Sequence, residues 1–251
     1  MLAAVRNKYD GVFVASNALP ESKEVFERLL EESISEWCNQ GIKLVWLQIP
    51  AQRCELIQSA LNNGFEFHHC LASELMLTKR LITNAYVPSF STHTIGVGAV
   101  VLSDRQEILT VLERLDLVAR PQYYKLPGGM LERGEHMSEG VVREVYEETG
   151  IQCEFQGLLS FRHHHRGQFG TSNIYAVCLL KPLTFDICID EVEIGKAMWI
   201  SVNQYLASDG VGAYNKQVVS AAISSKPMAS VKIDGYMDNP NDYEIYLPEN
   251  L

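Results

Sequence analysis

Residues 126–151 read LPGGMLERGEHMSEGVVREVYEETGI, and this is the most informative segment of the chain. The pair Gly128-Gly129 predicts a tight turn with an accessible backbone. Ser138 suits the N-cap of a helix, and Gly150 suits the left-handed residue that ends one. We therefore expect a short helix between Ser138 and Gly150, with a valine-lined side that docks on a sheet.

Three glutamates of this helix, Glu144, Glu147 and Glu148, are spaced three and four residues apart and share one face. Like charges at this spacing destabilise a helix by about 0.2–0.5 kcal/mol per pair. A hard divalent cation would remove the repulsion, and oxygen-only ligands favour Mg²⁺ or Mn²⁺ over zinc. Arg143 is placed to pair with an acid from the preceding loop, for which Glu135 is the candidate.

The spacing of these residues resembles the signature of the Nudix hydrolases at every defining position. Gly129 is followed after five residues by Glu135, and after seven more by REVYEETGI, residues 143–151. The resemblance implies an α/β fold, a Nudix α/β/α sandwich with a mixed sheet. It also implies that Glu135 and Arg143 hold the geometry of the loop and helix.

The same resemblance implies hydrolysis of the pyrophosphate in a nucleoside diphosphate linked to another group. It assigns Glu147 and Glu148 as ligands of Mg²⁺ or Mn²⁺ and Glu144 as a ligand or a base. The carbonyl of Gly129 joins the metal shell in this family. Cations in such a site neutralise the pyrophosphate and lower the pKa of the attacking water.

The general base of the family often comes from a loop outside the signature. Here the loop VEIGKAMW, residues 192–199, offers Glu193, and Asp190 and Glu191 lie beside it. The pattern Glu-Ile-x-x-Ala-x-Trp resembles the position at which relatives carry an acid in the site. We expect Glu193 to act as the catalytic base, with a structural role or a neighbouring acid as the alternatives.

Shorter motifs resemble one branch of the family, which includes the animal protein encoded antisense to basic fibroblast growth factor and the plant ADP-ribose/NADH pyrophosphatases. They are WLQIP (46–50), GFEFHH (64–69), KLPGG (125–129) and FRHHH (161–165). The branch implies a small acetyltransferase-like α+β domain ahead of the Nudix domain, and ADP-ribose or NADH as substrate. Position 124 is Tyr where close relatives are expected to carry Trp, which weakens the substrate assignment.

Arg162 and His165 fall on positions of the branch motif, and we expect them to contact a substrate phosphate or ribose. Tyr124 and its neighbour Tyr123 precede the Gly-Gly loop. They could stack on a nucleobase or pack at the rim of the core, and the sequence leaves both roles open. Two further aromatic residues are expected in the core: Phe169 and Tyr175.

The pattern of apolar residues predicts three segments: an N-terminal α+β domain (1–88), a Nudix domain (89–225) and an irregular C-terminal tail (226–251). The polar stretch 82–93 is the linker candidate. Within the second domain, we expect strands 95–102 and 108–112 to pair as a hairpin.

The composition is that of a globular protein, with 47% hydrophobic and 21% charged residues and a formal net charge of −10. The acidic excess argues against long nucleic acid and anionic membranes as partners, whereas a metal ion permits a small nucleotide diphosphate substrate. No apolar run of membrane-spanning length occurs. We expect a cytoplasmic protein with reduced, buried cysteines, because its six cysteines form no CxxC pair. Mitochondrial and nuclear locations stay open. A homodimer is the oligomeric state to test.

Two alternatives accompany the preferred function. One is hydrolysis of other nucleotides, such as 8-oxo-dGTP, CoA, FAD or capped RNA. The other is a non-catalytic Nudix module that senses a nucleotide, which the three crowded glutamates disfavour because a pure binding protein has no need of them.

Overall fold

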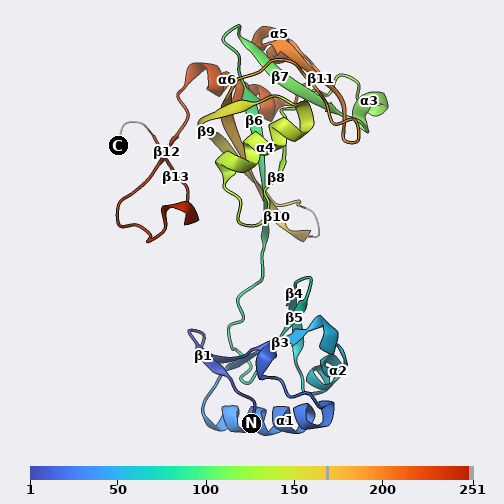
Figure 1. The fold of residues 1–251 in the computed structure, drawn as a ribbon, viewed down its shortest axis with the longest axis vertical. Coiled ribbons are helices and arrows are strands. Elements are labelled where there is room, and N and C mark those ends of the chain that lie inside the picture. Colours follow the sequence, from blue (N-terminus) through green and yellow to red (C-terminus); the bar gives the residue numbers. More distant parts are fainter. Residues whose placement is uncertain (168–169, 249–251) are drawn as a thin grey trace. The chain divides into compact units, whose positions relative to one another are not determined.

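The computed structural model describes residues 1–167 and 170–248. The chain divides into two compact units, Met1–Ser91 and Thr92–Leu251, drawn in blue to teal and in green to red in Figure 1. Each unit has its own hydrophobic core, so each is described by itself. Phe169, expected in the core, lies outside the described residues.

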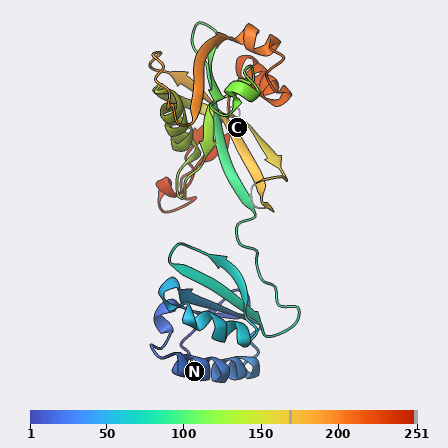
Figure 2. The ribbon, with the colours of Figure 1, turned by 90° about the vertical axis from the view of Figure 1, so that its right-hand side faces the viewer.

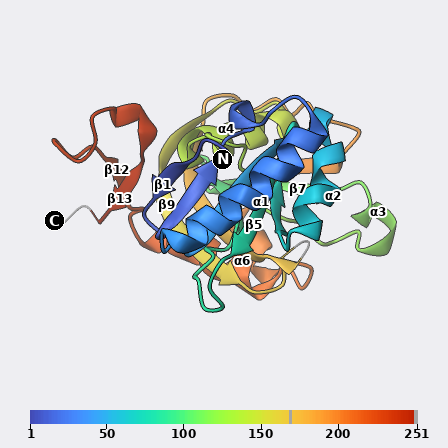
Figure 3. The same ribbon diagram turned by 90° about the horizontal axis from the view of Figure 1, so that it is seen from below.

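The first unit is a mixed sheet with two helices. Its strands are β1 (Val5–Asn7), β2 (Gly11–Val14), β3 (Leu44–Pro50), β4 (Glu66–Cys70) and β5 (Glu74–Arg80), in the order β1-β2-β3-β5-β4. Its helices are α1 (Lys23–Asn39) and α2 (Glu55–Asn62), which pack against each other (Figure 3). The unit is therefore α+β, and its likeness to acetyltransferases stays a prediction.

Apolar residues at helical spacing explain how α1 docks in this unit. Phe26, Leu30 and Trp37 are buried on one face of the helix and join the core below the sheet. Ser22 caps the helix by accepting a hydrogen bond from the N–H of Val25 at 3.3 Å.

The second unit is built on a four-stranded mixed sheet with the order β8-β6-β10-β9. Its strands are β6 (His93–Val101), β8 (Gly128–Met130), β9 (Cys153–His164) and β10 (Ser172–Pro182). β10 runs parallel to β6 and antiparallel to β9, and β8 runs antiparallel to β6. The glycine pair, expected in a tight turn, instead begins edge strand β8, because it pairs with Val97 and Gly98 of β6.

Helices cover both faces of this sheet, and Figure 2 shows α4 in yellow-green on one side and α6 in orange on the other. α4 (Met137–Thr149) buries Val141 and Val145 against one face. α5 (Val202–Ala207) and α6 (Ala213–Ser224) cover the other face. A short helix α3 (Asp116–Ala119) precedes β8 in the chain. The Nudix α/β/α sandwich with a mixed sheet is confirmed.

The predicted hairpin of strands 95–102 and 108–112 is wrong. β7 (Glu107–Glu113) pairs instead with β11 (Ile194–Ser201) in a separate two-stranded sheet. Both edges of β6 are already occupied by β10 and β8, so only the bridge between Leu102 and Ile108 remains from the expected pairing. Sequence proximity favours a hairpin, but two strands from further along the chain occupy the edges of β6.

The segment from residue 226, expected to be irregular, contains two short strands and a 3-10 turn. They are β12 (Ala229–Val231), η4 (Pro240–Asp242) and β13 (Ile245–Leu247), drawn in red in Figure 1. Met228 and Leu158 exchange two backbone hydrogen bonds of 2.8 and 3.0 Å, which attach this segment to β9. Its backbone groups therefore find partners that the local sequence does not reveal.

No helix in the described ranges is long and apolar enough to cross a membrane. The six cysteines are all free thiols. The expectation that they are buried is wrong for most of them, since only Cys153 and Cys178 are buried and the other four are exposed. The sequence alone does not show which way a cysteine side chain faces, and these four are exposed to solvent.

Candidate active site

Ser138 was expected to be the N-cap of α4, but the helix already begins one residue earlier, at Met137. His136 occupies the N-cap position and makes no side-chain cap hydrogen bond, and Ser138 lies inside the first turn. At the other end, Gly150 adopts a φ of 70° and ends the helix, as expected. A residue with a Cβ is strained in this left-handed conformation, which explains why glycine stands there.

Arg143 binds three carboxylates at once. Its guanidinium donates to Glu135 through two nitrogens at 2.7 and 3.0 Å, to Glu147 at 2.8 Å and to Glu144 at 3.1 Å. It also donates to the carbonyl oxygen of Met130 at 3.3 Å. These contacts raise the pKa of the Arg143 guanidinium and lower that of the Glu135 carboxyl. The pairing of Arg143 with Glu135 that the spacing suggested is present.

The glycine pair brings the backbone of β8 against two glutamates of α4. The N–H of Gly128 donates a hydrogen bond of 3.0 Å to Oε2 of Glu148. A Cβ on Gly129 would meet the carboxylate of Glu144, which would have to move to make room for it. The expected neighbours Gly129, Glu144 and Glu148 therefore meet at one end of the sheet.

Burial makes the charge on these glutamates costly. Glu148 is 8% exposed, and burial, followed by the nearby Glu144, Glu193 and Glu113, raises its pKa to about 8 against the hydrogen bond from Gly128. Burial also raises the pKa of Glu144, although Arg143 opposes the shift. A buried carboxylate surrounded by other carboxylates lacks a compensating positive charge.

The donor set fits a hard divalent cation. Glu144, Glu147 and Glu148 supply only oxygen atoms, and the uncompensated charge at Glu148 is what such a cation would balance. In the described ranges 1–167 and 170–248, however, no group of three or more His, Cys, Asp or Glu side chains already surrounds one metal position. Arg143 holds Glu144 and Glu147 instead, so the cation would compete with this guanidinium for them.

A cleft of about 570 Å³ contains the carboxylates and opens beside β11. The glutamates of α4 line it together with Asp190 and Glu193 from the facing loop. Two bonds from Arg114 hold that loop: its N–H donates to the carbonyl oxygen of Glu193 at 2.8 Å, and its guanidinium donates to the carbonyl oxygen of Glu191. The structure thus places Glu193 in the same cleft as the helix glutamates.

Two tyrosines that were not predicted as site residues flank Arg162. The guanidinium lies over the ring of Tyr175 on β10 at 5.4 Å and over the ring of Tyr214 on α6 at 5.3 Å. Tyr175 was expected in the core and is largely buried. Burial, followed by the charges of Glu148 and other nearby groups, raises the pKa of its hydroxyl. Sequence reasoning missed both tyrosines because strand pairing and α6 bring them to Arg162.

None of the three predicted substrate residues, Tyr124, Arg162 and His165, lines the cleft of the glutamates. His165 is exposed, and its Nδ1 lies 3.2 Å from the hydroxyl of Ser172. Tyr124 packs against the core on the α5 and α6 face. Its role in substrate binding stays a prediction.

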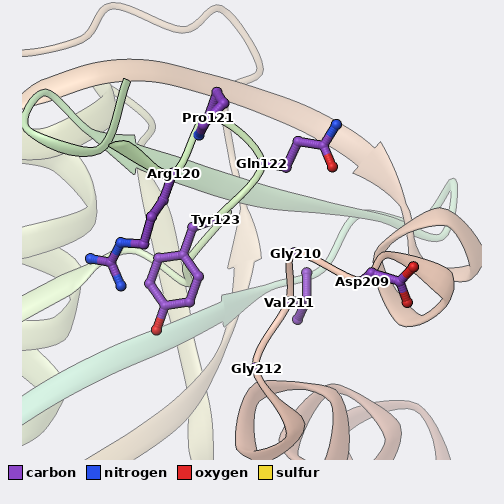
Figure 4. Close-up of a pocket in the computed structure, with 8 residues that line it drawn as sticks. All are labelled: Arg120, Pro121, Gln122, Tyr123, Asp209, Gly210, Val211 and Gly212. Carbon is purple, nitrogen blue, oxygen red and sulfur yellow. The ribbon is translucent and has the colours of Figure 1, made fainter. Parts of the chain in front are cut away.

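Tyr123 lines a different cavity of about 450 Å³, shown in Figure 4. There the loop 120–123 faces the loop 209–212, and the guanidinium of Arg120 lies over the Tyr123 ring at 4.2 Å. A bidentate contact with Asp116, at 2.9 and 3.0 Å, holds Arg120 in place. Tyr123 therefore stacks on a side chain of its own chain.

Two family models match the chain. Residues 2–81 match one described as a Nudix hydrolase domain, and residues 92–221, just over half of the chain, match one described as a NUDIX domain. The chain belongs to the Nudix hydrolase family, as the signature predicted. The second match contains the glutamate helix, the glycine pair and Glu193.

Curated relatives place the chain within the family. Nudix hydrolase 8 of Arabidopsis thaliana is 36% identical over 208 residues, which are 82% of this chain and 56% of that protein. Nudix hydrolase 2 of the same plant is 36% identical over 215 residues, 85% of this chain and 77% of that protein. Nucleoside diphosphate-linked moiety X motif 6 of Mus musculus is 39% identical over 181 residues, 70% of this chain and 57% of that protein. The predicted branch of plant and animal proteins is confirmed, and the chain spans little more than half the length of two of these three relatives.

Proposed function

We propose that this protein is a pyrophosphohydrolase that uses Mg²⁺ or Mn²⁺ to cleave a nucleoside diphosphate linked to another moiety. ADP-ribose and NADH are the preferred substrates. The observation that carries the proposal is the buried carboxylate of Glu148, bonded to Gly128 and left among other carboxylates in an open cleft. The mouse relative bears the name of this substrate class.

The residues divide the work by position. Glu144, Glu147 and Glu148, with the carbonyl of Gly129, would hold the cation, which supplies positive charge to the pyrophosphate and lowers the pKa of water. Arg143, which two hydrogen bonds to Glu135 hold in place, orients the glutamates. The negative charge of the glutamates would repel a phosphate, so phosphate binding at this place is favourable only with a cation.

Glu193 is the proposed base because it lies across the cleft from α4 on a loop held by Arg114. Its carboxylate accepts the proton of the attacking water, the water oxygen bonds to one phosphorus, and the bond from that phosphorus to the bridging oxygen breaks. Two phosphate monoesters result, which from ADP-ribose are AMP and ribose 5-phosphate. Asp190, in the same cleft, is the alternative base.

Arg162 is the proposed contact for substrate phosphate or ribose. Its guanidinium lies over two tyrosine rings, and Tyr175 links this position electrostatically to the glutamates. A guanidinium recognises phosphate oxygens through paired hydrogen bonds. The tyrosines limit the side-chain freedom that would otherwise be lost on binding.

The test is a hydrolysis panel with ADP-ribose, NADH, FAD, CoA, 8-oxo-dGTP and capped RNA at about 5 mM Mg²⁺ or Mn²⁺, a level chosen to fill weak carboxylate sites. Glu148→Gln is the site variant. Glu154→Gln, an exposed glutamate on β9, is the matched control. We expect AMP release by the wild type and the control, and a loss on the order of a hundredfold in Glu148→Gln.

Cleavage of a different panel member would retain the reaction and replace the substrate. Nucleotide binding without hydrolysis, unchanged by Glu148→Gln, would contradict the proposal in favour of a sensor. Location in the cytoplasm and assembly as a homodimer stay predictions, to be checked by cell fractionation and by sedimentation of the full chain.

A further inference from the structure

The first turn of α4 is completed by a residue from the other end of the domain. The carboxylate of Glu244 accepts hydrogen bonds from the N–H of Met137 at 2.7 Å and from the N–H of Ser138 at 3.3 Å. The hydroxyl of Ser138 also donates to it. The residue at the N-cap, His136, offers these N–H groups no side-chain acceptor, so Glu244 supplies one from a distance of more than one hundred residues.

The position of Glu244 is itself fixed by its own segment. The side chain is 9% exposed. The Nε2–H of His136 donates to the carbonyl oxygen of Asn241 at 2.7 Å, which ties the η4 turn to the helix entry. On the other side, Tyr246 packs against Phe155 of β9 with ring centroids 5.9 Å apart. The segment from Met228 to Leu247 therefore connects β9 to the start of α4 through Glu244.

A chain of contacts leads from Glu244 to the glutamates. The first turn that Glu244 caps follows directly after Glu135, whose carboxylate receives two bonds from Arg143. Arg143 in turn holds Glu144 and Glu147. Fraying of the first turn would release the loop that carries Glu135, and with it the orientation of Arg143.

We infer that Glu244 is a positioning residue: it caps the glutamate helix from the C-terminal segment and fixes the Glu135–Arg143 pair that orients the metal-binding face. A carboxylate is suited to this place because the positive end of the helix dipole and two N–H donors face it. The inference rests on the proposed function for its catalytic consequence, but its structural part stands without it.

The experiment uses the full chain with Glu244→Gln, which keeps the side-chain size and loses the charge. Glu139→Gln, an exposed glutamate in the same first turn of α4, is the matched control. Three quantities are measured: hydrogen exchange of the peptides covering residues 130–140 without metal, Mn²⁺ affinity without substrate, and kcat and KM for the best panel substrate.

For Glu244→Gln we expect about fivefold faster exchange in the first turn, the scale on which loss of a cap opens a helix end. Mn²⁺ affinity should fall about tenfold and kcat about tenfold, with KM within twofold, as for removal of a residue that orients metal ligands. Glu139→Gln should match the wild type in all three.

Two results would overturn the inference. Unchanged exchange in Glu244→Gln would show that the cap does not hold the first turn. Faster exchange with unchanged Mn²⁺ affinity would show that the cap stabilises the helix without orienting its glutamates. If the wild type hydrolyses no panel member, the proposed function fails, while exchange and Mn²⁺ affinity still decide the role of Glu244.

Discussion

The N–H of Gly128 donates a 3.0 Å hydrogen bond to the carboxylate of Glu148. This bond joins edge strand β8 to helix α4, and Glu148 lines the cleft. It opposes the rise in the pKa of Glu148 that burial causes, yet the pKa still reaches about 8. The protein thus holds a carboxylate in a place where its charge is unfavourable until a cation arrives.

The stability of the metal-free protein should therefore fall as the pH rises from about 5 to 8. Folded Glu148 binds its proton with a pKa of about 8, against 4.5 in the unfolded chain. The contribution of Glu148 to the stability of the folded protein is complete below the pKa of the unfolded chain. It is lost as the pH rises through the pKa of the folded protein. Glu144, whose pKa is also raised, acts in the same direction.

Thermal unfolding in the presence of EDTA, followed by circular dichroism across this pH range, measures the effect. Glu148→Gln should flatten the profile and raise the melting temperature at pH 8, and Mg²⁺ should stabilise the wild type more at pH 8 than at pH 5. A profile of the same slope in both proteins would show that Glu148 is not the responsible group.

Replacement of Arg143 by Lys should lower kcat/KM by about 10–100-fold, because a point charge cannot make the paired contacts with Glu135 and the third with Glu147. Glu135→Gln should give a loss of similar size. In a double-mutant cycle the two losses should be strongly non-additive, since each removes the same pair. Arg133→Lys, in the exposed loop before Glu135, is the control and should leave kcat/KM unchanged. Additive losses would argue that Arg143 and Glu135 act separately.

Loss of the proposed base should change the pH dependence of the reaction as well as its rate. Glu193→Gln should lower kcat by about 10²–10⁴-fold and remove the acid limb of the pH–rate profile. Asp190→Asn should keep the acid limb, because Asp190 lines the same cleft but is only the alternative to the proposed base. A profile in which only Asp190→Asn removes the limb would transfer the role to that residue.

Arg162→Lys should raise KM by about tenfold, equivalent to about 1.4 kcal/mol of binding, while kcat stays within about threefold. Lysine keeps the charge but loses the planar group that lies over Tyr175 and Tyr214. Steady-state kinetics with ADP-ribose measures both constants, and Arg166→Lys, on the exposed loop after β9, serves as the control. A fall in kcat at constant KM would place Arg162 with the catalytic groups instead.

Much of the second unit could be predicted because its signals are local. Gly150 ends α4 through its own backbone conformation, and the helical period alone puts Glu144, Glu147 and Glu148 on one face. The partner of Arg143 was also predictable, since Glu135 is only eight residues away. Each of these three predictions depended on near neighbours in the chain, and each agrees with the structure.

Predictions that depended on distant partners were less successful. β7 was expected beside β6 but pairs with β11, because β8 and β10 occupy the two edges of β6. Ser138 was expected to begin α4, but His136 takes the cap position and Glu244 satisfies the first turn. No sequence pattern near residue 138 indicates that the C-terminal segment supplies a hydrogen-bond acceptor to the first turn of α4.

The family follows from the sequence alone through its resemblance to the Nudix signature, which also implied the sandwich fold, and helical spacing alone specifies the acidic face of α4. Only the tertiary structure decided that Tyr175 and Tyr214 flank Arg162, that Glu193 shares the cleft, and that Glu244 caps the helix. The reason is physical: buried polar groups must find partners in space, and close packing selects those partners from any distance along the chain.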